Sequence, residues 1–198
     1  MRKYSTKKAL ETNHEELAVF HPLQQALLVS RGVTTLEEAQ RFLQPSYDDH
    51  THDPLSILGM EKSVLRILEG MKKGERITIY SDYDHDGIPG GVVLHDFFKK
   101  VGYENFTNYI PHRYTEGYGL NIGAIEKLAA EGTTLLVTVD CGITDVQPVK
   151  RANELGLDVI ISDHHLPHGE LPPAFAILNS KQEDCAYAYD MLCGAAVA

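Results

Sequence analysis

Three aspartates alternate along one short stretch of the chain. Asp82, Asp84 and Asp86 are followed at once by Gly87, and they come directly after a strand-like run, 77–81. Carboxylates packed this closely repel one another and lose solvation when buried, unless cations hold them together. Carboxylate oxygens are also the ligands that hard divalent cations prefer. The stretch therefore predicts a divalent metal site.

Two further polar clusters follow strand-like runs. Asp140 comes directly after one run, and Asp163-His164-His165 comes directly after another. The carboxyl ends of parallel strands share one rim of a sheet, where open α/β folds bind their ligands. Carboxylates with one or two imidazoles suit Mn²⁺ or Mg²⁺ better than structural zinc or calcium. The density of acids suggests two ions sharing a bridging carboxylate, an arrangement that promotes in-line attack of hydroxide on phosphorus.

Each cluster also has a simpler interpretation. D-x-D-x-D-G resembles the start of a calcium loop, but position twelve is Val93 rather than the glutamate that such loops use. Asp140 alone is equally well explained as a turn former or a helix cap. A zinc-binding helix running from the two histidines to His168 is disfavoured by Pro167 and Gly169.

The segment 110–120 carries groups that suit a nucleotide. Arg113 has a planar guanidinium that can clamp a phosphate, and Tyr114 or Tyr118 can stack on a base. An ordinary surface loop, with Arg113 paired to Glu116, is the competing interpretation.

Alternating helices and strands must position these residues. The expected helices cover 60–74, 90–101, 122–130 and 146–155. The expected strands cover 77–81, 106–110, 134–139, 159–162 and 175–178. This alternation predicts an α/β fold, a mostly parallel sheet flanked by helices.

The N-terminal segment, residues 1–57, lacks this alternation and is expected to form a small helical appendage. Two short helices are expected in it. A capping-box pair, Thr34 and Glu37, opens the second helix, and Pro45 ends it. Residues 46–57 are expected to be a polar link, and the first dozen residues to be frayed.

The composition limits which binding partners and which cellular compartment are expected for this chain. The formal net charge of −10 argues against a broad, non-specific grip on nucleic acid, although it leaves room for a local basic groove. No apolar run approaches transmembrane length and the start lacks a signal sequence, so we expect a soluble, cytoplasmic protein with no membrane partner. Cys141, Cys185 and Cys193 form no C-x-x-C pair and are expected to be reduced and mostly buried.

Six blocks of sequence, taken in order, resemble the DHH phosphoesterase family, and within it the RecJ-like single-stranded-DNA exonucleases. The blocks are R-G-V-T-T-x-E-E-A-x-x-F-L-x-P (31–45), I-x-x-Y-S-D-Y-D-H-D-G (77–87), I-P-H-R-Y-T-E-G-Y-G-L-N (110–121), T-V-D-C-G-I-T (138–144), I-I-S-D-H-H (160–165) and L-C-G-A-A-V-A (192–198). The resemblance implies a DHH phosphoesterase domain over 58–198. It also implies two Mn²⁺ or Mg²⁺ ions, 5′-to-3′ hydrolysis of single-stranded DNA, and a role in DNA repair and recombination. A single-stranded-DNA-binding protein or a helicase is a further candidate partner.

The resemblance implies a role for each metal ligand. Asp82 and Asp84 would bind the first ion, and Asp86 and His164 the second. Asp140 would bridge the two ions.

Four residues would act on the substrate. His165 would face the scissile phosphate, and Asp163 would orient the histidines. Arg113 and Tyr118 would hold the nucleotide backbone.

The sequence departs from the family pattern in two places. The family usually has a hydroxyl residue near positions 89–90, where this chain has Pro89-Gly90, and losing that helix cap would cost about 1 kcal/mol. The chain also ends before a further motif aspartate and a second domain, which predicts a truncated phosphoesterase domain. The alternatives are a DHH phosphoesterase for pyrophosphate, oligonucleotides or cyclic dinucleotides, and a non-catalytic RecJ-like scaffold.

Overall fold

The computed structural model describes residues 14–198, so the expectation of a frayed start lies outside the described residues. The chain divides into two compact units, Met1–Thr51 and His52–Ala198. Among residues 14–198, no helix has both the length and the apolar surface that crossing a bilayer requires.

The first unit is a set of short helices. They are η1 (Glu15–Leu17), α1 (Pro22–Val29), α2 (Leu36–Leu43) and α3 (Tyr47–His50). Leu17, Leu28 and Ala39 form its small buried core. Residues 46–57 are not a plain polar link as expected, because Ser46 caps α3 and the next unit opens with η2 (Pro54–Ser56).

The capping box of α2 lies one residue later than expected. The hydroxyl of Thr35 accepts a hydrogen bond from the Glu38 amide, and the Glu38 carboxylate accepts one from the Thr35 amide. The predicted pair, Thr34 and Glu37, has the same spacing, so sequence spacing alone could not distinguish the two.

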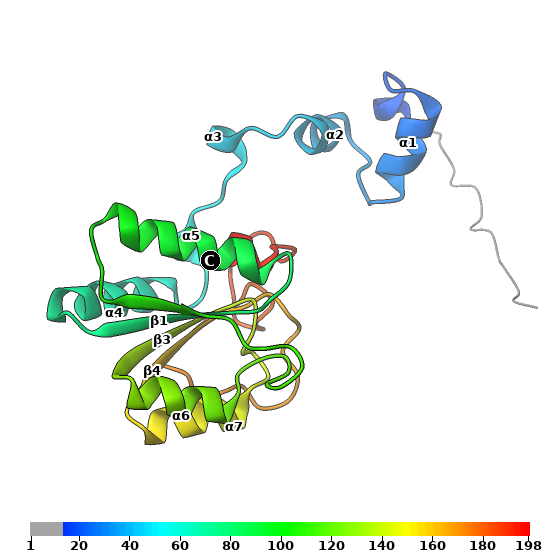
Figure 1. The fold of residues 1–198 in the computed structure, drawn as a ribbon. Coiled ribbons are helices and arrows are strands. Elements are labelled where there is room, and N and C mark those ends of the chain that lie inside the picture. The colour runs from blue at the N-terminus through cyan, green and yellow to red at the C-terminus, as the bar shows by residue number, and fades with distance from the viewer. Residues whose placement is uncertain (1–13) are drawn as a thin grey trace, which may run out of the picture. The chain divides into compact units, whose positions relative to one another are not determined.

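The second unit is an α/β sandwich around one five-stranded sheet (Figure 1). After η2 come α4 (Met60–Lys73), β1 (Arg76–Ser81), α5 (Gly87–Lys100), β2 (Phe106–Tyr109), α6 (Ile122–Ala130), β3 (Thr133–Val139), α7 (Val146–Glu154), β4 (Asp158–Ser162), β5 (Ala176–Leu178) and α8 (Gly194–Val197). All the strand pairs are parallel, in the order β2-β1-β3-β4-β5. The predicted α/β fold with a parallel sheet is confirmed.

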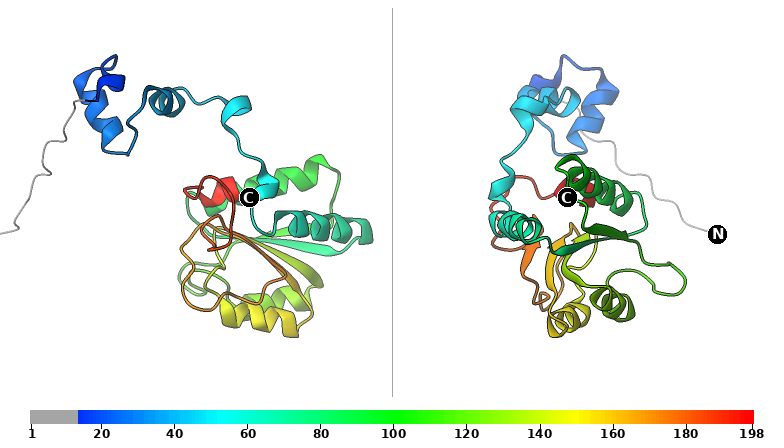
Figure 2. Two further views of the ribbon diagram at one scale, coloured as in Figure 1. Left: turned by 180° about the vertical axis from the view of Figure 1, so that it is seen from behind. Right: turned by 60° about the vertical axis from the view of Figure 1, so that its left-hand side comes forward.

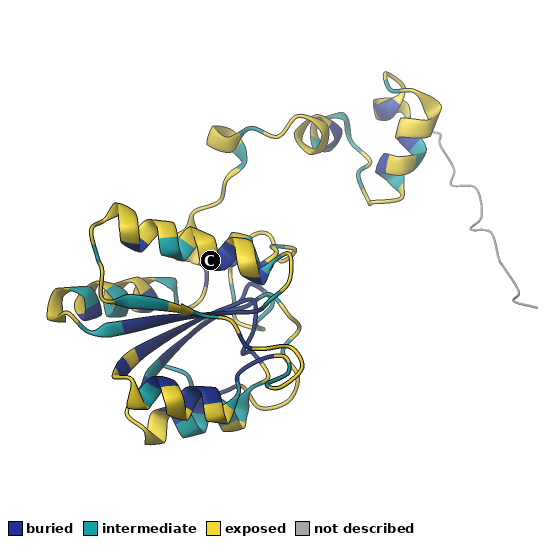
Figure 3. Ribbon diagram, viewed as in Figure 1, coloured by how far each residue is buried: buried dark blue, intermediate teal, exposed yellow. Residues whose placement is uncertain are grey.

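Period-two alternation along the strands builds a core on each face of the sheet. Ile77 and Ile79 of β1 pack with Phe98 on the face covered by α4 and α5, whereas Tyr80 packs with Ile125 on the face covered by α6 and α7. Figure 3 shows the inner strands β1, β3 and β4 mostly buried, with exposed residues on the outer sides of the helices, whereas the edge strand β2 is partly exposed. A sheet buried on both faces is a rigid base for side chains at its carboxyl edge.

Helix α5 begins at Gly87, three residues before its predicted start at 90. Pro89 is tolerated because it falls in the first turn, where its missing N–H would have no helical partner. A Cβ on Gly90 would lie 2.6 Å from Cγ1 of Val139 and 3.1 Å from Cα of Ala195. A hydroxyl residue at this position would therefore displace Val139, and glycine is what allows α5 to approach the sheet and α8 so closely.

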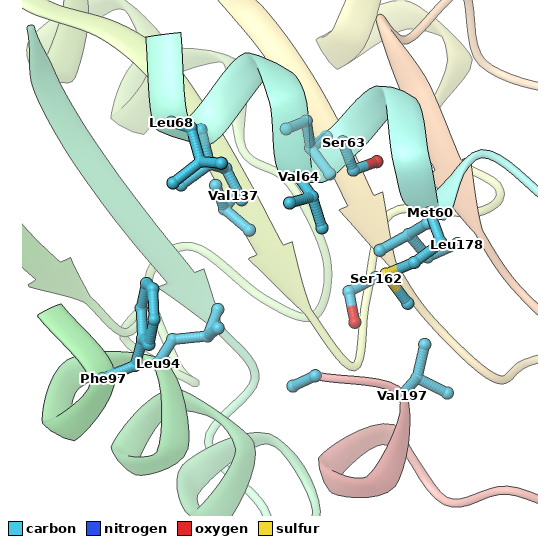
Figure 4. Close-up of a pocket in the computed structure, with 13 residues that line it drawn as sticks. Met60, Ser63, Val64, Leu68, Leu94, Phe97, Val137, Ser162, Leu178 and Val197 are labelled. Atoms are coloured by element: carbon cyan, nitrogen blue, oxygen red, sulfur yellow. The ribbon is translucent and has the colours of Figure 1, made fainter. Parts of the chain in front are cut away.

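The four-residue helix α8, which the sequence patterns did not predict, packs beside α5 (Figure 2). Between α4, α5 and α8 lies an apolar pocket (Figure 4). Val64 and Leu68 of α4 and Phe97 of α5 line it and are 40%, 49% and 41% exposed. The lining includes two hydroxyls, those of Ser63 and Ser162, and no carboxylate, imidazole, thiol or amine, so this pocket is not where chemistry is expected.

The three cysteines are unpaired, but the expectation that they are mostly buried is wrong. Only Cys141 is buried; Cys185 is partly exposed and Cys193 is exposed. Cys141 follows Asp140 at the edge of the sheet, whereas Cys193 precedes the short helix α8 at the surface.

Candidate metal centre

Four polar residues form a row along the carboxyl edge of the sheet. Asp82, Asp140, Asp163 and Asn179 each come one residue after the end of β1, β3, β4 or β5. The strand ladder continues into this row, since the amides of Asp82, Asp140 and Asp163 donate to the carbonyls of Val139, Ser162 and Leu178. All four are buried, with exposures of 3%, 1%, 1% and 0%. Sheet register therefore sets these side chains side by side.

Asp140 occupies the centre of the site in an unusual conformation. Its φ of 61° is the only positive value among the described residues other than glycines. Backbone in this region costs free energy and is found mostly where neighbouring structure enforces it. The buried Oδ1 of Asp140 accepts no hydrogen bond, and Nε2 of His164 lies 3.1 Å from it. An orphaned carboxylate oxygen beside an imidazole nitrogen is the arrangement that a metal ion completes.

Two groups of ligand atoms meet at Asp140. Asp82, Asp84 and Asp140 form one group, and Asp140, His164 and His165 form the other, with the ligand atoms of each group within 4.8 Å of one another. Oδ1 of Asp82, like that of Asp140, is buried and has no hydrogen-bond partner. Because Asp140 belongs to both groups, the geometry fits a carboxylate shared between two neighbouring cations.

The electrostatics of the site also favour a cation. Burial, together with the nearby carboxylates of Asp86 and Asp84, raises the pKa of Asp140 to about 8. Burial likewise raises the pKa of Asp82. Both shifts penalise the ionised carboxylates that the folded chain brings together, and a divalent ion would reverse that penalty. The residues present therefore fit Mn²⁺ or Mg²⁺.

Asp84 and Asp86 are already engaged with the backbone. Oδ1 of Asp84 accepts hydrogen bonds from the amides of Asp86 and Gly87, which hold the pKa of Asp84 below its usual value. The two oxygens of Asp86 accept from the amides of Gly194 and Ala195 at 2.7 and 2.8 Å. Burial opposes ionisation of Asp86, but these bonds outweigh it and lower its pKa.

Asp86 thus ties the first turn of α8 to the site. Its Oδ2 lies 3.5 Å from Nε2 of His164, yet Asp86 belongs to neither group of three ligands.

Asp163 orients the two histidines. Its Oδ1 accepts from the amides of His164 and His165 and lies 2.7 Å from Nδ1 of His165. Its Oδ2 accepts from the amide of Ile143. With both oxygens used, Asp163 acts on the site through the histidines, and its bond to Nδ1 leaves Nε2 of His165 free to act. The phenol of Tyr118 lies 3.3 Å from Nδ1 of His165.

Arg113 lies beside the first aspartate cluster. Its guanidinium carbon is 5.2 Å from the centroid of the Tyr83 ring, a cation–π contact. The competing pairing with Glu116 is absent, because Glu116 accepts instead from the His112 amide and the Tyr109 hydroxyl. Arg113 and Tyr114 are exposed, and Arg113 forms no ion pair with any described residue.

Sequence reasoning missed several residues that build the site. Gly194 and Ala195 supply amides to Asp86, and Asn179 and Lys181 contact the histidine pair. Asn179 follows β5 just as the aspartates follow their strands. The same position after a strand therefore predicts Asn179 when amide side chains are considered together with acids and histidines. No local pattern marks the amides, because their role depends on where α8 packs.

Comparisons with known proteins agree with this geometry. The model of the DHH family, N-terminal domain, matches residues 76–198. The chain is 44% identical over 178 residues to the single-stranded-DNA-specific exonuclease RecJ of Bacillus subtilis and 34% identical over 177 residues to that of Escherichia coli. Each match covers 89% of this chain but only 22% and 30%, respectively, of the relative.

A solved structure is similar as well. A crystal structure of exonuclease RecJ bound to manganese superposes with a TM-score of 0.67 at 30% identity, covering 74% of this chain and 37% of that one. The family model covers most of the chain, including the whole strand-end row, and so the chain belongs to the DHH family.

Proposed function

We propose that the chain carries the metal centre of a RecJ-like exonuclease that hydrolyses phosphodiester bonds of single-stranded DNA. The observation that carries the proposal is the buried, orphaned carboxylate of Asp140, which both ligand groups share. No other group of described residues offers three such ligands.

Five residues would hold two Mn²⁺ or Mg²⁺ ions. Asp82 and Asp84 would bind the first ion, Asp86 and His164 the second, and Asp140 both. Such ions supply positive charge that stabilises the attacking and leaving oxygens of an in-line displacement at phosphorus, and they acidify water. For Asp86 to act as a ligand, it must present an oxygen to the ion while keeping its bonds to α8.

The remaining polar residues would handle the substrate. His165, with Nδ1 bonded to Asp163, would direct Nε2 at the scissile phosphate and exchange a proton there. Tyr118 would hold the phosphate backbone through its hydroxyl and Arg113 through its guanidinium. Arg113 and the bound ions would offset the net charge of −10 where DNA approaches.

The relatives supply the substrate class in this proposal. Both are single-stranded-DNA-specific exonucleases, and we infer 5′-to-3′ hydrolysis by this chain in DNA repair and recombination in the cytoplasm. Within the chain, 58–198 would be the phosphoesterase domain and 1–57 a helical appendage. A single-stranded-DNA-binding protein or a helicase would be a natural partner.

The test is nucleotide release from 5′-labelled single-stranded DNA with Mn²⁺, compared with duplex DNA and with a dinucleotide. We expect release from the single strand that EDTA abolishes and that Asp140→Ala removes. The Lys150→Met variant alters an exposed ion pair with Glu170 and serves as the control. Cleavage of the dinucleotide but not of the single strand would identify the chain as a small-substrate phosphoesterase and contradict the exonuclease proposal. Full activity of the Asp140→Ala variant would refute the role of Asp140 as a shared ligand.

A further inference from the structure

The row at the sheet edge ends in an amide rather than an acid. Asn179 follows β5 as Asp163 follows β4, and its side chain is completely buried. A neutral amide adds no charge to the crowded carboxylates, and it both donates and accepts hydrogen bonds. Its contacts therefore indicate what this position contributes to the site.

Asn179 and Lys181 hold the main chain of the histidine pair. Nδ2 of Asn179 donates to the carbonyl of His165 at 2.8 Å, and Nζ of Lys181 donates to the carbonyl of His164 at 2.5 Å. Oδ1 of Asn179 accepts from the Lys181 amide at 2.8 Å, which closes the turn that presents the lysine.

These contacts complete the hydrogen bonding of the dipeptide. Asp163 binds both amides of His164 and His165, and the 179–181 turn binds both carbonyls. None of these four bonds belongs to a helix or strand, so regular secondary structure does not hold the pair in place. Side chains that follow β4 and β5 do so instead.

The Lys181 ammonium contacts the His164 carbonyl rather than an acidic side chain. Among residues 14–198, no carboxylate lies within ion-pair distance of its Nζ. It also lines the cavity that contains Tyr118, His165 and His168. A lysine without an acidic partner, partly buried in an acidic chain, indicates that the contact with His164 determines its position.

We propose that Asn179 and Lys181 are positioning residues of the metal centre, which set the directions of the His164 and His165 imidazoles by clamping their carbonyls. The inference rests on the proposed metal site. Partners that orient metal-binding histidines commonly change metal affinity by about 10- to 100-fold when removed. The edge strand β5 thereby becomes part of the site without supplying a ligand.

The experiment uses two readouts on the 198-residue chain. Mn²⁺ affinity is measured by calorimetry, and hydrogen exchange of the His164 and His165 amides is measured without metal. Lys181→Met removes the ammonium and keeps the apolar stem. Asn179→Leu removes both hydrogen bonds of the amide at similar volume and adds no charge to the acidic site. Lys181→Arg is the conservative rescue. Lys62→Met is the matched control, because Nζ of Lys62 donates to the Phe175 carbonyl at the same 2.5 Å outside the site.

We expect Lys181→Met and Asn179→Leu to weaken Mn²⁺ binding by about tenfold and to speed exchange of both amides, whereas Lys181→Arg and Lys62→Met leave both readouts near wild type. A loss of melting temperature with unchanged affinity and exchange would reduce the turn to a structural role and overturn the proposal. Exchange is read without metal or DNA, so it tests the clamp even if the chain fails to cleave DNA.

Discussion

Nε2 of His164 lies 3.1 Å from Oδ1 of Asp140, across the gap between two neighbouring strand ends. Neither atom has a place in the regular hydrogen bonding of the sheet. The contact joins the acidic cluster that follows β1 to the histidines that follow β4, with Asp140, which follows β3, between them. Replacing any of these groups should therefore affect both halves of the site.

The Asp140→Asn variant tests how much stability the protein loses when buried Asp140 ionises in the absence of metal. The folded protein keeps a proton on Asp140 up to a pKa of about 8, whereas the unfolded chain releases it near 3.8. The contribution of Asp140 to stability is thus complete below pH 4 and is lost as pH rises through about 8. In EDTA, we expect the Asp140→Asn variant to melt higher than wild type at pH 8 and at the same temperature at pH 4.

At pH 8, Mn²⁺ should raise the melting temperature of wild type above that of the Asp140→Asn variant, because only wild type offers the shared carboxylate. Thermal melts at the two pH values, with and without Mn²⁺, check both statements. Equal melting of the two proteins in EDTA at pH 8 would contradict the raised pKa.

Gly194→Ala should damage the metal site through packing alone. A Cβ at this position would lie 2.4 Å from Oδ1 of Asp140, so either the carboxylate or α8 must move. We expect Mn²⁺ affinity to fall at least about tenfold, as for other changes that misplace a metal ligand. Gly123→Ala, in the exposed first turn of α6, is the control and should leave the affinity unchanged. Wild-type Mn²⁺ affinity in the Gly194→Ala variant would show that the site accommodates the added methyl group without displacing Asp140.

Arg66→Met should lower stability without touching the metal site. Arg66 of α4 donates to Glu75 at 2.7 Å and to Asp158 at 2.6 Å, and only 10% of its side chain is exposed. Losing these charge-assisted bonds should cost about 2 kcal/mol in denaturant unfolding. Lys73→Met, which breaks an exposed pair with Glu69, should cost less than about 0.5 kcal/mol. Mn²⁺ affinity should be unchanged in both.

Arg113→Ala should weaken substrate binding more than the chemical step. Its guanidinium is exposed beside Tyr83 and unpaired with any described acid, so it is available to a phosphate. We expect KM for single-stranded DNA to rise with kcat little changed, and the salt dependence of binding to fall by about one charge. Lys127→Met, which removes a similar contact with Tyr109, is the matched control. A fall in kcat at constant KM would assign Arg113 to the transition state instead.

Much of the fold could be predicted because its patterns are local. Apolar runs of strand length alternate with helical periodicity, and the predicted strands all appear within a residue or two of their expected ends. The helix faces were less predictable. Val64 and Leu68 fit a helical stripe, yet both remain substantially exposed beside the pocket, because the pattern says nothing about what covers a helix.

The first residues of the helices were also not determined by local sequence patterns. The reciprocal spacing of a capping box fits Thr34 and Glu37 as well as Thr35 and Glu38, and only the hydrogen bonds of the folded chain separate the two pairs. The early start of α5 depends on Gly90 lying against Val139 and Ala195, residues distant in the sequence.

By itself, the sequence determined that Asp82, Asp140 and Asp163 meet on one rim, because parallel strands must bring their carboxyl ends together. Only the tertiary structure decided how their oxygens are used. The positive φ of Asp140 leaves its Oδ1 unbonded, whereas the packing of α8 occupies both oxygens of Asp86. Hydrogen-bond partners of this kind come from segments far apart in the chain, and residue spacing carries no record of them.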